Sequence, residues 1–160
     1  MEELIEILDE RGSFLGKKPR SEVHRRGLWH RASNVFLFRS SGDLLVQRRQ
    51  YDKDVCPGVW DLSAAEHLQP GENFEQGAIR GLLEELSVEG VKLELFGDGT
   101  KTRLEIPESH IKDYEFQQSF RAIYDGPVFP DPVEVHEVST VNLKELGKKF
   151  LDEPESYTPW

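Results

Sequence analysis

The chain has 160 residues, a length typical of one domain, and its 37% apolar and 31% charged residues indicate a globular protein rather than a disordered one. Its net charge of −10 argues against a nucleic-acid backbone as partner. No apolar run approaches the roughly 20 residues that span a bilayer, the acidic N-terminus is unlike a secretory signal, and the one cysteine, Cys56, suits a reducing compartment, so we expect a cytoplasmic protein without membrane contact.

Short apolar runs separated by turn residues predict strands along most of the chain. A turn at residues 10–12 between two such runs predicts an N-terminal hairpin over about residues 1–20. Ser21 is expected to cap a short helix that ends at His24. A second hairpin is predicted around the turn at 40–43. The predicted strands comprise residues 4–8, 13–15, 34–38, 44–47, 59–62, 91–96, 103–106, 116–124 and 133–141.

Two longer helices are predicted among these strands. Apolar residues recur every four positions from Phe74 to Leu86, which is the stripe of an amphipathic helix over about residues 73–87. Another helix is predicted over 143–151, before a proline. With no internal repeat and no linker, residues 1–160 are interpreted as one α+β domain in which helices pack on a mixed sheet.

Acidic residues gather around the first of these helices. Glu72 lies at its start, and Arg80 and Glu84 are four residues apart and share a face with Glu85 beside them. Exposed Glu-Glu pairs are more often solvated than bound to metal. Clustered carboxylates nevertheless repel one another unless a hard cation such as Mg²⁺ lies among them, so a metal site for diphosphate chemistry is the alternative interpretation.

Residues 66–88 resemble the Nudix box, which pairs glutamates on a loop and helix after a strand. Glu72, Arg80, Leu82, Glu84, Glu85 and Val88 match the motif, whereas Glu66 and Ser87 replace its glycines and Gly81 replaces a glutamate. The resemblance implies an α/β/α sandwich with a mixed β-sheet and a cofactor of Mg²⁺, or alternatively Mn²⁺. It also implies that Glu84 and Glu85 are catalytic metal ligands, with Glu72 a further candidate ligand, and that Arg80 has the structural role of orienting a carboxylate.

The resemblance extends over about residues 1–150 to the isopentenyl-diphosphate isomerase branch of that superfamily. It implies metal ligands at His30, His67, Asp113 and Glu115, the last also near the position of a catalytic glutamate. The catalytic cysteine of the isomerase would fall at Ala65. For His30 we favour a satisfied loop histidine, whereas for His67 a ligand and a loop histidine remain equally open.

Two cations and a terminal segment have open interpretations. Arg49 and Lys53 resemble residues that contact a diphosphate, and a solvated strand end is an equal alternative for both. The C-terminal residues 157–160 are interpreted as a packing segment, with closure over a pocket or a dimer partner as the alternative.

Gly81 cannot act as base or ligand, so the carboxylate that the motif has there must come from elsewhere if the site is active. We hypothesise that Glu66 supplies it and that Glu66 points toward Glu84 and Glu85. The alternative is that Glu66 is merely tolerated and the site is impaired. Glu134 and Glu137 are candidates for a further ligand from outside the motif.

Three functions follow from these patterns. The first is Mg²⁺-dependent hydrolysis of a diphosphate linkage in a small phosphorylated metabolite, by a monomer or homodimer. The second is prenyl-diphosphate isomerisation, which Ala65 disfavours. The third is a diphosphate-binding module that has lost its chemistry through Gly81.

Overall fold

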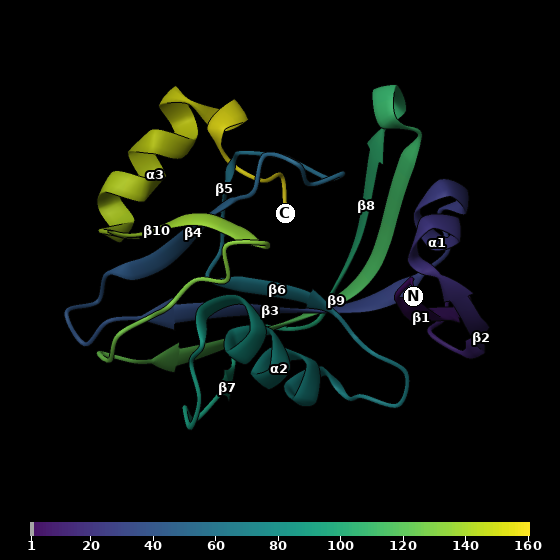
Figure 1. The fold of residues 1–160 in the computed structure, drawn as a ribbon, viewed down its shortest axis with the longest axis horizontal. Coiled ribbons are helices and arrows are strands. Elements are labelled where there is room, and N and C mark those ends of the chain that lie inside the picture. The colour runs from purple at the N-terminus through teal and green to yellow at the C-terminus, as the bar shows by residue number, and fades with distance from the viewer. Residues whose placement is uncertain (1) are drawn as a thin grey trace.

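A mixed eight-stranded sheet forms the centre of this computed structural model, which describes residues 2–160 (Figure 1). The central strand β3 pairs in parallel with β9 along its whole length and antiparallel with β6. Strand β4 pairs with β10 and β5, and strand β9 also pairs with β7 and β8. The strands are β3 (His30–Phe38), β4 (Leu44–Arg49), β5 (Trp60–Asp61), β6 (Ala64–His67), β7 (Glu94–Leu95), β8 (Thr100–Ile106), β9 (Ile111–Ile123) and β10 (Val135–Val141).

Helices α2 (Phe74–Leu86) and α3 (Leu143–Asp152) cover opposite faces of this sheet (Figure 1). Alternate residues of a strand point to opposite faces, so Val35 of β3 packs with Leu82 of α2, whereas Phe36 packs with Leu146 of α3. The two apolar clusters therefore form the two layers of an α/β/α sandwich. This confirms the predicted fold class.

The N-terminal segment forms a separate two-stranded sheet, β1 (Leu4–Leu8) and β2 (Phe14–Pro19), followed by α1 (Arg20–Arg26). The predicted hairpin is thus present, but the predicted cap at Ser21 is wrong. Helix α1 begins at Arg20 directly after Pro19, and no side chain caps it. Helix α1 packs against β9, which brings its buried face to the central sheet.

Strand β6 was not predicted as a strand, and β8 and β9 are longer than predicted. Ala64-Ala-Glu-His67 contains no β-branched residue and no Phe, Tyr or Trp, and it is extended because it pairs with residues 32–35 of β3. Strands β8 and β9 continue to a 3₁₀ turn, η1 (Pro107–Ser109), in a hairpin that projects beyond the sheet (Figure 1). Another short turn, η2 (Pro154–Ser156), follows α3.

Within residues 2–160, no helix has the length and apolar character needed to cross a membrane.

Candidate functional site

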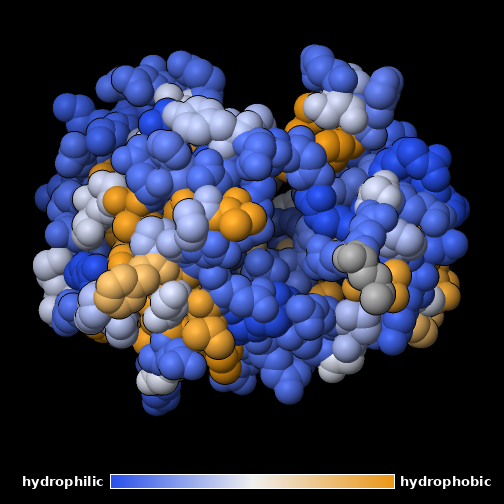
Figure 2. Space-filling view, viewed as in Figure 1, coloured by the Kyte–Doolittle hydropathy of each residue, from blue (hydrophilic) through white to orange (hydrophobic). Residues whose placement is uncertain are grey.

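A cavity of about 680 Å³ opens between the sheet, α1, α2 and the loop that follows β4. Figure 2 shows a hollow near the middle of the molecule that is surrounded by hydrophilic residues. The lining residues include ten aspartates and glutamates but only four arginines and lysines. The cavity is therefore strongly acidic, which opposes entry of an anion unless cations enter with it.

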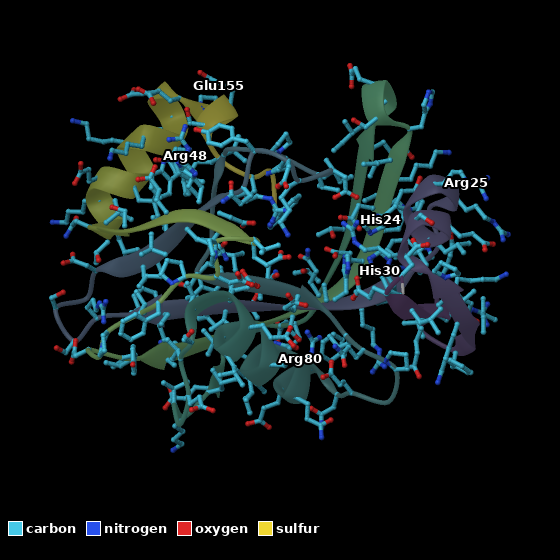
Figure 3. The ribbon with its side chains drawn as sticks, in the orientation of Figure 1. His24, Arg25, His30, Arg48, Arg80 and Glu155 are labelled. Carbon is cyan, nitrogen blue, oxygen red and sulfur yellow. The ribbon has the colours of Figure 1, made fainter. Side chains whose placement is uncertain are left out.

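Three histidines and an aspartate meet beside the cavity: His24, His67 and Asp113 line it, and His30 is fully buried next to them. His24 comes from α1, His30 from β3, His67 from β6 and Asp113 from β9, and one potential ligand atom of each lies within 4.8 Å of all the others. Figure 3 shows His24 and His30 side by side although they lie on different elements. The sheet register produces this meeting, because His30 pairs with Glu115 on β9 while Ala32 pairs with His67 on β6.

The polar atoms of this cluster fit a divalent cation. Among residues 2–160, both ring nitrogens of His24, Nε2 of His30 and Oδ1 of Asp113 are buried without a hydrogen-bond partner. The other nitrogen of His30 is held by the carbonyl oxygen of Leu28 at 3.0 Å, which aims Nε2 at the cluster. Buried polar atoms are rarely left unpaired, and imidazole nitrogens with a carboxylate oxygen form a donor set suited to several divalent metals.

The charge states of these histidines differ because their surroundings differ. Burial, together with the charge of the neighbouring His67, lowers the pKa of His24 to about 4. Burial also opposes protonation of His67, yet Glu115 and Glu3 outweigh it and raise the pKa of His67 to about 10. Glu115 lies 3.5 Å from Nε2 of His67 and 3.7 Å from Nε2 of His30, and its pKa is lowered by these contacts.

A second group of carboxylates surrounds Arg80 of α2 (Figure 3). Nη1 of Arg80 donates to Glu66 and to Glu84, both at 2.9 Å. Nε and Nη2 donate to the two oxygens of Glu72 at 2.9 and 3.0 Å, and Nη2 also donates to the carbonyl of His67 at 2.7 Å. All five N–H groups of a guanidinium are thereby used, so Arg80 fixes the loop after β6 to α2.

The predicted carboxylates have different positions around this arginine. Glu66, Glu84 and Glu85 line the cavity. Glu72 does not line the cavity. Both of its oxygens accept hydrogen bonds, from Arg80 and from the backbone N–H of Gln69. Its placement therefore gives no support to a role as metal ligand.

Glu85 is the most deeply buried carboxylate of this wall. Its Oε1 accepts the backbone N–H of Ala65 at 3.1 Å, and its Oε2 accepts a hydrogen bond from the side chain of Gln47. Burial, together with the charge of Glu66, raises the pKa of Glu85 to about 8. A carboxylate with so high a pKa in a cavity is typical of a functional site.

Arg49 and Lys53 also line the cavity. Arg49 is held by Asp61 at 2.9 Å and by the carbonyl of Val55 at 3.1 Å. Lys53 pairs with Glu134, which also lines the cavity, and burial lowers the pKa of Lys53. Both side chains are thus partly buried at the cavity, and a contact with a diphosphate stays a prediction.

Two further residues, Glu137 and Trp160, differ in their position relative to the cavity. Glu137 pairs with Arg48 and does not line the cavity. Trp160 does line it, and its Nε1 donates to Asp61 at 3.1 Å while its ring stacks over Arg49 at 5.7 Å. The C-terminal segment therefore has the packing role that the sequence predicts, and Trp160 packs at the cavity.

Comparison with known proteins agrees with this architecture. The family model described as NUDIX domain matches residues 28–160. The chain belongs to the Nudix family. An isopentenyl-diphosphate Delta-isomerase of Serratia proteamaculans is 30% identical over 100% of this chain and 88% of the relative. A second such isomerase, from Cereibacter sphaeroides, is 36% identical over 87% of this chain and 78% of the relative. This Nudix protein therefore lies near the isomerase branch.

Solved structures show the same fold at low sequence identity. The structure of DR0079 from Deinococcus radiodurans has a TM-score of 0.76 and 21% identity, and the match covers 94% of this chain and 90% of that one. An Ap4A hydrolase from C. elegans has a TM-score of 0.56 and 19% identity, and the match covers 74% and 83% of the two chains. These likenesses concern the Nudix fold.

Two histidines of this cluster, His24 and His30, differ from what the sequence predicts. His30 is not a satisfied loop histidine, because it is buried in β3 and its Nε2 has no hydrogen-bond partner among the described residues. His24 was interpreted only as the end of a helix. The signal that could have found it is weak: it is the sole imidazole on a short helix rich in arginine, placed six residues before another histidine.

Proposed function

We propose that this Nudix protein is a Mg²⁺-dependent hydrolase that cleaves a diphosphate linkage in a small phosphorylated metabolite. The observation that carries the proposal is the composition of the cavity, in which ten acidic residues face four arginines and lysines. Such a cavity favours divalent cations, and an anionic substrate can enter it only together with them. When bound, the cations would neutralise the diphosphate oxygens and lower the pKa of an attacking water.

The residues of the chain support distinct parts of this function. Arg49 and Lys53 supply fixed positive charge for the phosphates on one side of the cavity. Glu84 and Glu85 supply carboxylate oxygens on the other side. The histidine cluster and Glu115 supply a second group of metal donors, of which all but His30 line the same cavity.

Hydrolysis is favoured over isomerisation because no cysteine is among the residues that line the cavity in the described part of the chain, 2–160. Ala65 lines the cavity, and the resemblance places the catalytic cysteine of the isomerase at this position. Within residues 2–160 the one cysteine, Cys56, is absent from the lining, and burial raises the pKa of its thiol, which makes the thiolate scarce.

Isomerisation of a prenyl diphosphate is the second candidate. The relatives at 30% and 36% identity bear that name, and the cluster of His30, His67, Asp113 and Glu115 coincides with the ligands that the resemblance implies.

One experiment separates the two candidates. The purified protein is incubated in D₂O with nucleoside diphosphate derivatives and with isopentenyl diphosphate, with Mg²⁺ or with EDTA, and the products are followed by ³¹P NMR and mass spectrometry. Mg²⁺-dependent cleavage of at least one P–O–P linkage supports the proposal. A deuterated allylic diphosphate without cleavage supports isomerisation and refutes it, and unchanged substrates throughout refute both.

A further inference from the structure

The side chain of Glu66 fills the space beside Gly81. A Cβ atom placed on Gly81 would lie 2.7 Å from Cγ and 3.3 Å from Cβ of Glu66, closer than side chains approach one another. Cβ and Cγ are the stem of the glutamate, so they cannot move aside without carrying the carboxylate with them. Glu66 in its observed place therefore requires glycine at position 81.

The carboxylate of Glu66 contacts the arginine that holds the cavity wall together. Its Oε2 accepts from Nη1 of Arg80 at 2.9 Å, and the same nitrogen donates to Glu84 at 2.9 Å. Glu84 has a half-exposed side chain and no other hydrogen-bond partner within residues 2–160. The hydrogen bond from Arg80 therefore holds its carboxylate at the cavity. Glu66 holds the guanidinium from the other side.

We propose that Glu66 is a positioning residue of the hydrolase site. Its side chain, on β6, takes the place of the side chain missing at Gly81 on α2, and it holds Arg80 and Glu84 at the cavity. The Nudix box has glycine and glutamate at these two positions, and this chain has them exchanged. The catalytic role of Glu66 rests on the proposed function. The exchange of volume, in which the side chain at position 66 fills the space left by glycine at position 81, is independent of that function.

The exchange of volume is tested by thermal unfolding of metal-free protein. Gly81→Ala forces Glu66 out of its place and is expected to lower the Tm by at least about 3 °C. In the double variant Glu66→Ala/Gly81→Ala the clash is absent, so alanine at 81 should not lower the Tm below that of Glu66→Ala alone. The matched control is Gly147→Ala, since Gly147 lies on α3 with no atom within 4 Å of an added Cβ, so the Tm should hold or rise. Equal tolerance of alanine at 81 and 147 overturns the proposal.

The positioning role is tested with Glu66→Gln, which keeps the volume and can accept the Arg80 hydrogen bond but lacks the charge. We expect kcat to fall about tenfold or more while KM changes less than about threefold, because the change affects the arrangement of the wall and not the phosphate contacts. Mn²⁺ titration followed by EPR, after one equivalent of Zn²⁺ has filled the histidine cluster, should show weaker Mn²⁺ binding in this variant. Unaltered kcat and Mn²⁺ binding overturn the proposal.

The swapped variant Glu66→Gly/Gly81→Glu provides the rescue. It restores the order of the Nudix box and should bind Mn²⁺ more tightly, and turn over faster, than Glu66→Gly alone; no gain in either overturns the proposal. Should the wild-type protein cleave no diphosphate, the proposed function fails, while the Tm comparison and the Mn²⁺ titration still decide whether positions 66 and 81 act as a pair.

Discussion

Replacing Arg80 with alanine should destabilise this Nudix protein substantially. The change removes five hydrogen bonds and leaves Glu66, Glu72 and Glu84 without their shared counter-charge. Glu84 is half exposed and contributes little, because water screens it. Glu66 and Glu72 are about one-fifth exposed, so breaking their pairs dominates the cost. Breaking buried pairs costs about 3–5 kcal/mol, and partial exposure brings the expected loss to about 3–4 kcal/mol.

The assay is chemical and thermal unfolding of the metal-free protein. At roughly 2–4 °C per kcal/mol for a chain of this size, the Tm should fall by about 6–16 °C. Arg80→Lys is the matched control, since lysine keeps the charge but has three donors and no planar fork, and it should lose about half as much. A loss below about 1 kcal/mol for Arg80→Ala would refute the view that one guanidinium joins the loop to α2.

The same variant carries a prediction about pH. Burial opposes ionisation of Glu72, but Arg80 outweighs it and lowers the pKa of Glu72 below its usual value of 4.5. A carboxylate with a lowered pKa in the folded state contributes stability above its unfolded pKa and loses it as the pH falls through the folded value. The part of the stability difference between wild type and Arg80→Ala that comes from the Glu72–Arg80 pair should therefore be lost as the pH falls below about 4.5.

Three further predictions concern the core, the cation side of the cavity and the histidine cluster. Leu82→Ala, at a fully buried position of α2, should cost about 2–5 kcal/mol in urea unfolding, and a cost below 1 kcal/mol would contradict the packing of α2 on the sheet. Lys53→Met should raise KM for the hydrolysed diphosphate about tenfold with a smaller change in kcat, and an unchanged KM would place the phosphates elsewhere. Asp113→Asn should weaken Zn²⁺ binding at least about tenfold in calorimetry and reduce the gain in Tm on adding Zn²⁺, whereas wild-type affinity would exclude Asp113 from the metal donors.

The fold followed from the sequence where the signal was local. The stripe from Phe74 to Leu86 predicted α2 to within one residue at each end, because the face that packs against the sheet has an apolar residue at every fourth position. Strand β6 could not be predicted in the same way. Its residues Ala64 to His67 have weak strand preference, and their conformation depends on pairing with β3, some thirty residues earlier in the chain.

The site was predictable only in part for the same reason. The carboxylates of α2 and Arg80 lie within one helix, so their grouping could be deduced from spacing. The histidine cluster joins four elements, and its geometry depends on the parallel register of β3 with β9 and on the docking of α1 against β9. Nothing in the residues around His24 specifies that docking.

The charge of the cavity leads to a last prediction, which concerns coupled binding. Because acidic lining residues outnumber arginines and lysines by ten to four, a diphosphate should bind weakly alone and more strongly when a divalent cation is bound beside it. Coupling free energies are reciprocal, so the factor by which Mg²⁺ tightens binding of imidodiphosphate must equal the factor by which imidodiphosphate tightens binding of Mg²⁺. We expect a factor of at least about ten in calorimetric titrations at constant ionic strength. Equal affinity for imidodiphosphate with Mg²⁺ and with EDTA would show that Arg49 and Lys53 suffice to bind the phosphates, and would remove the electrostatic basis for a metal-dependent reaction.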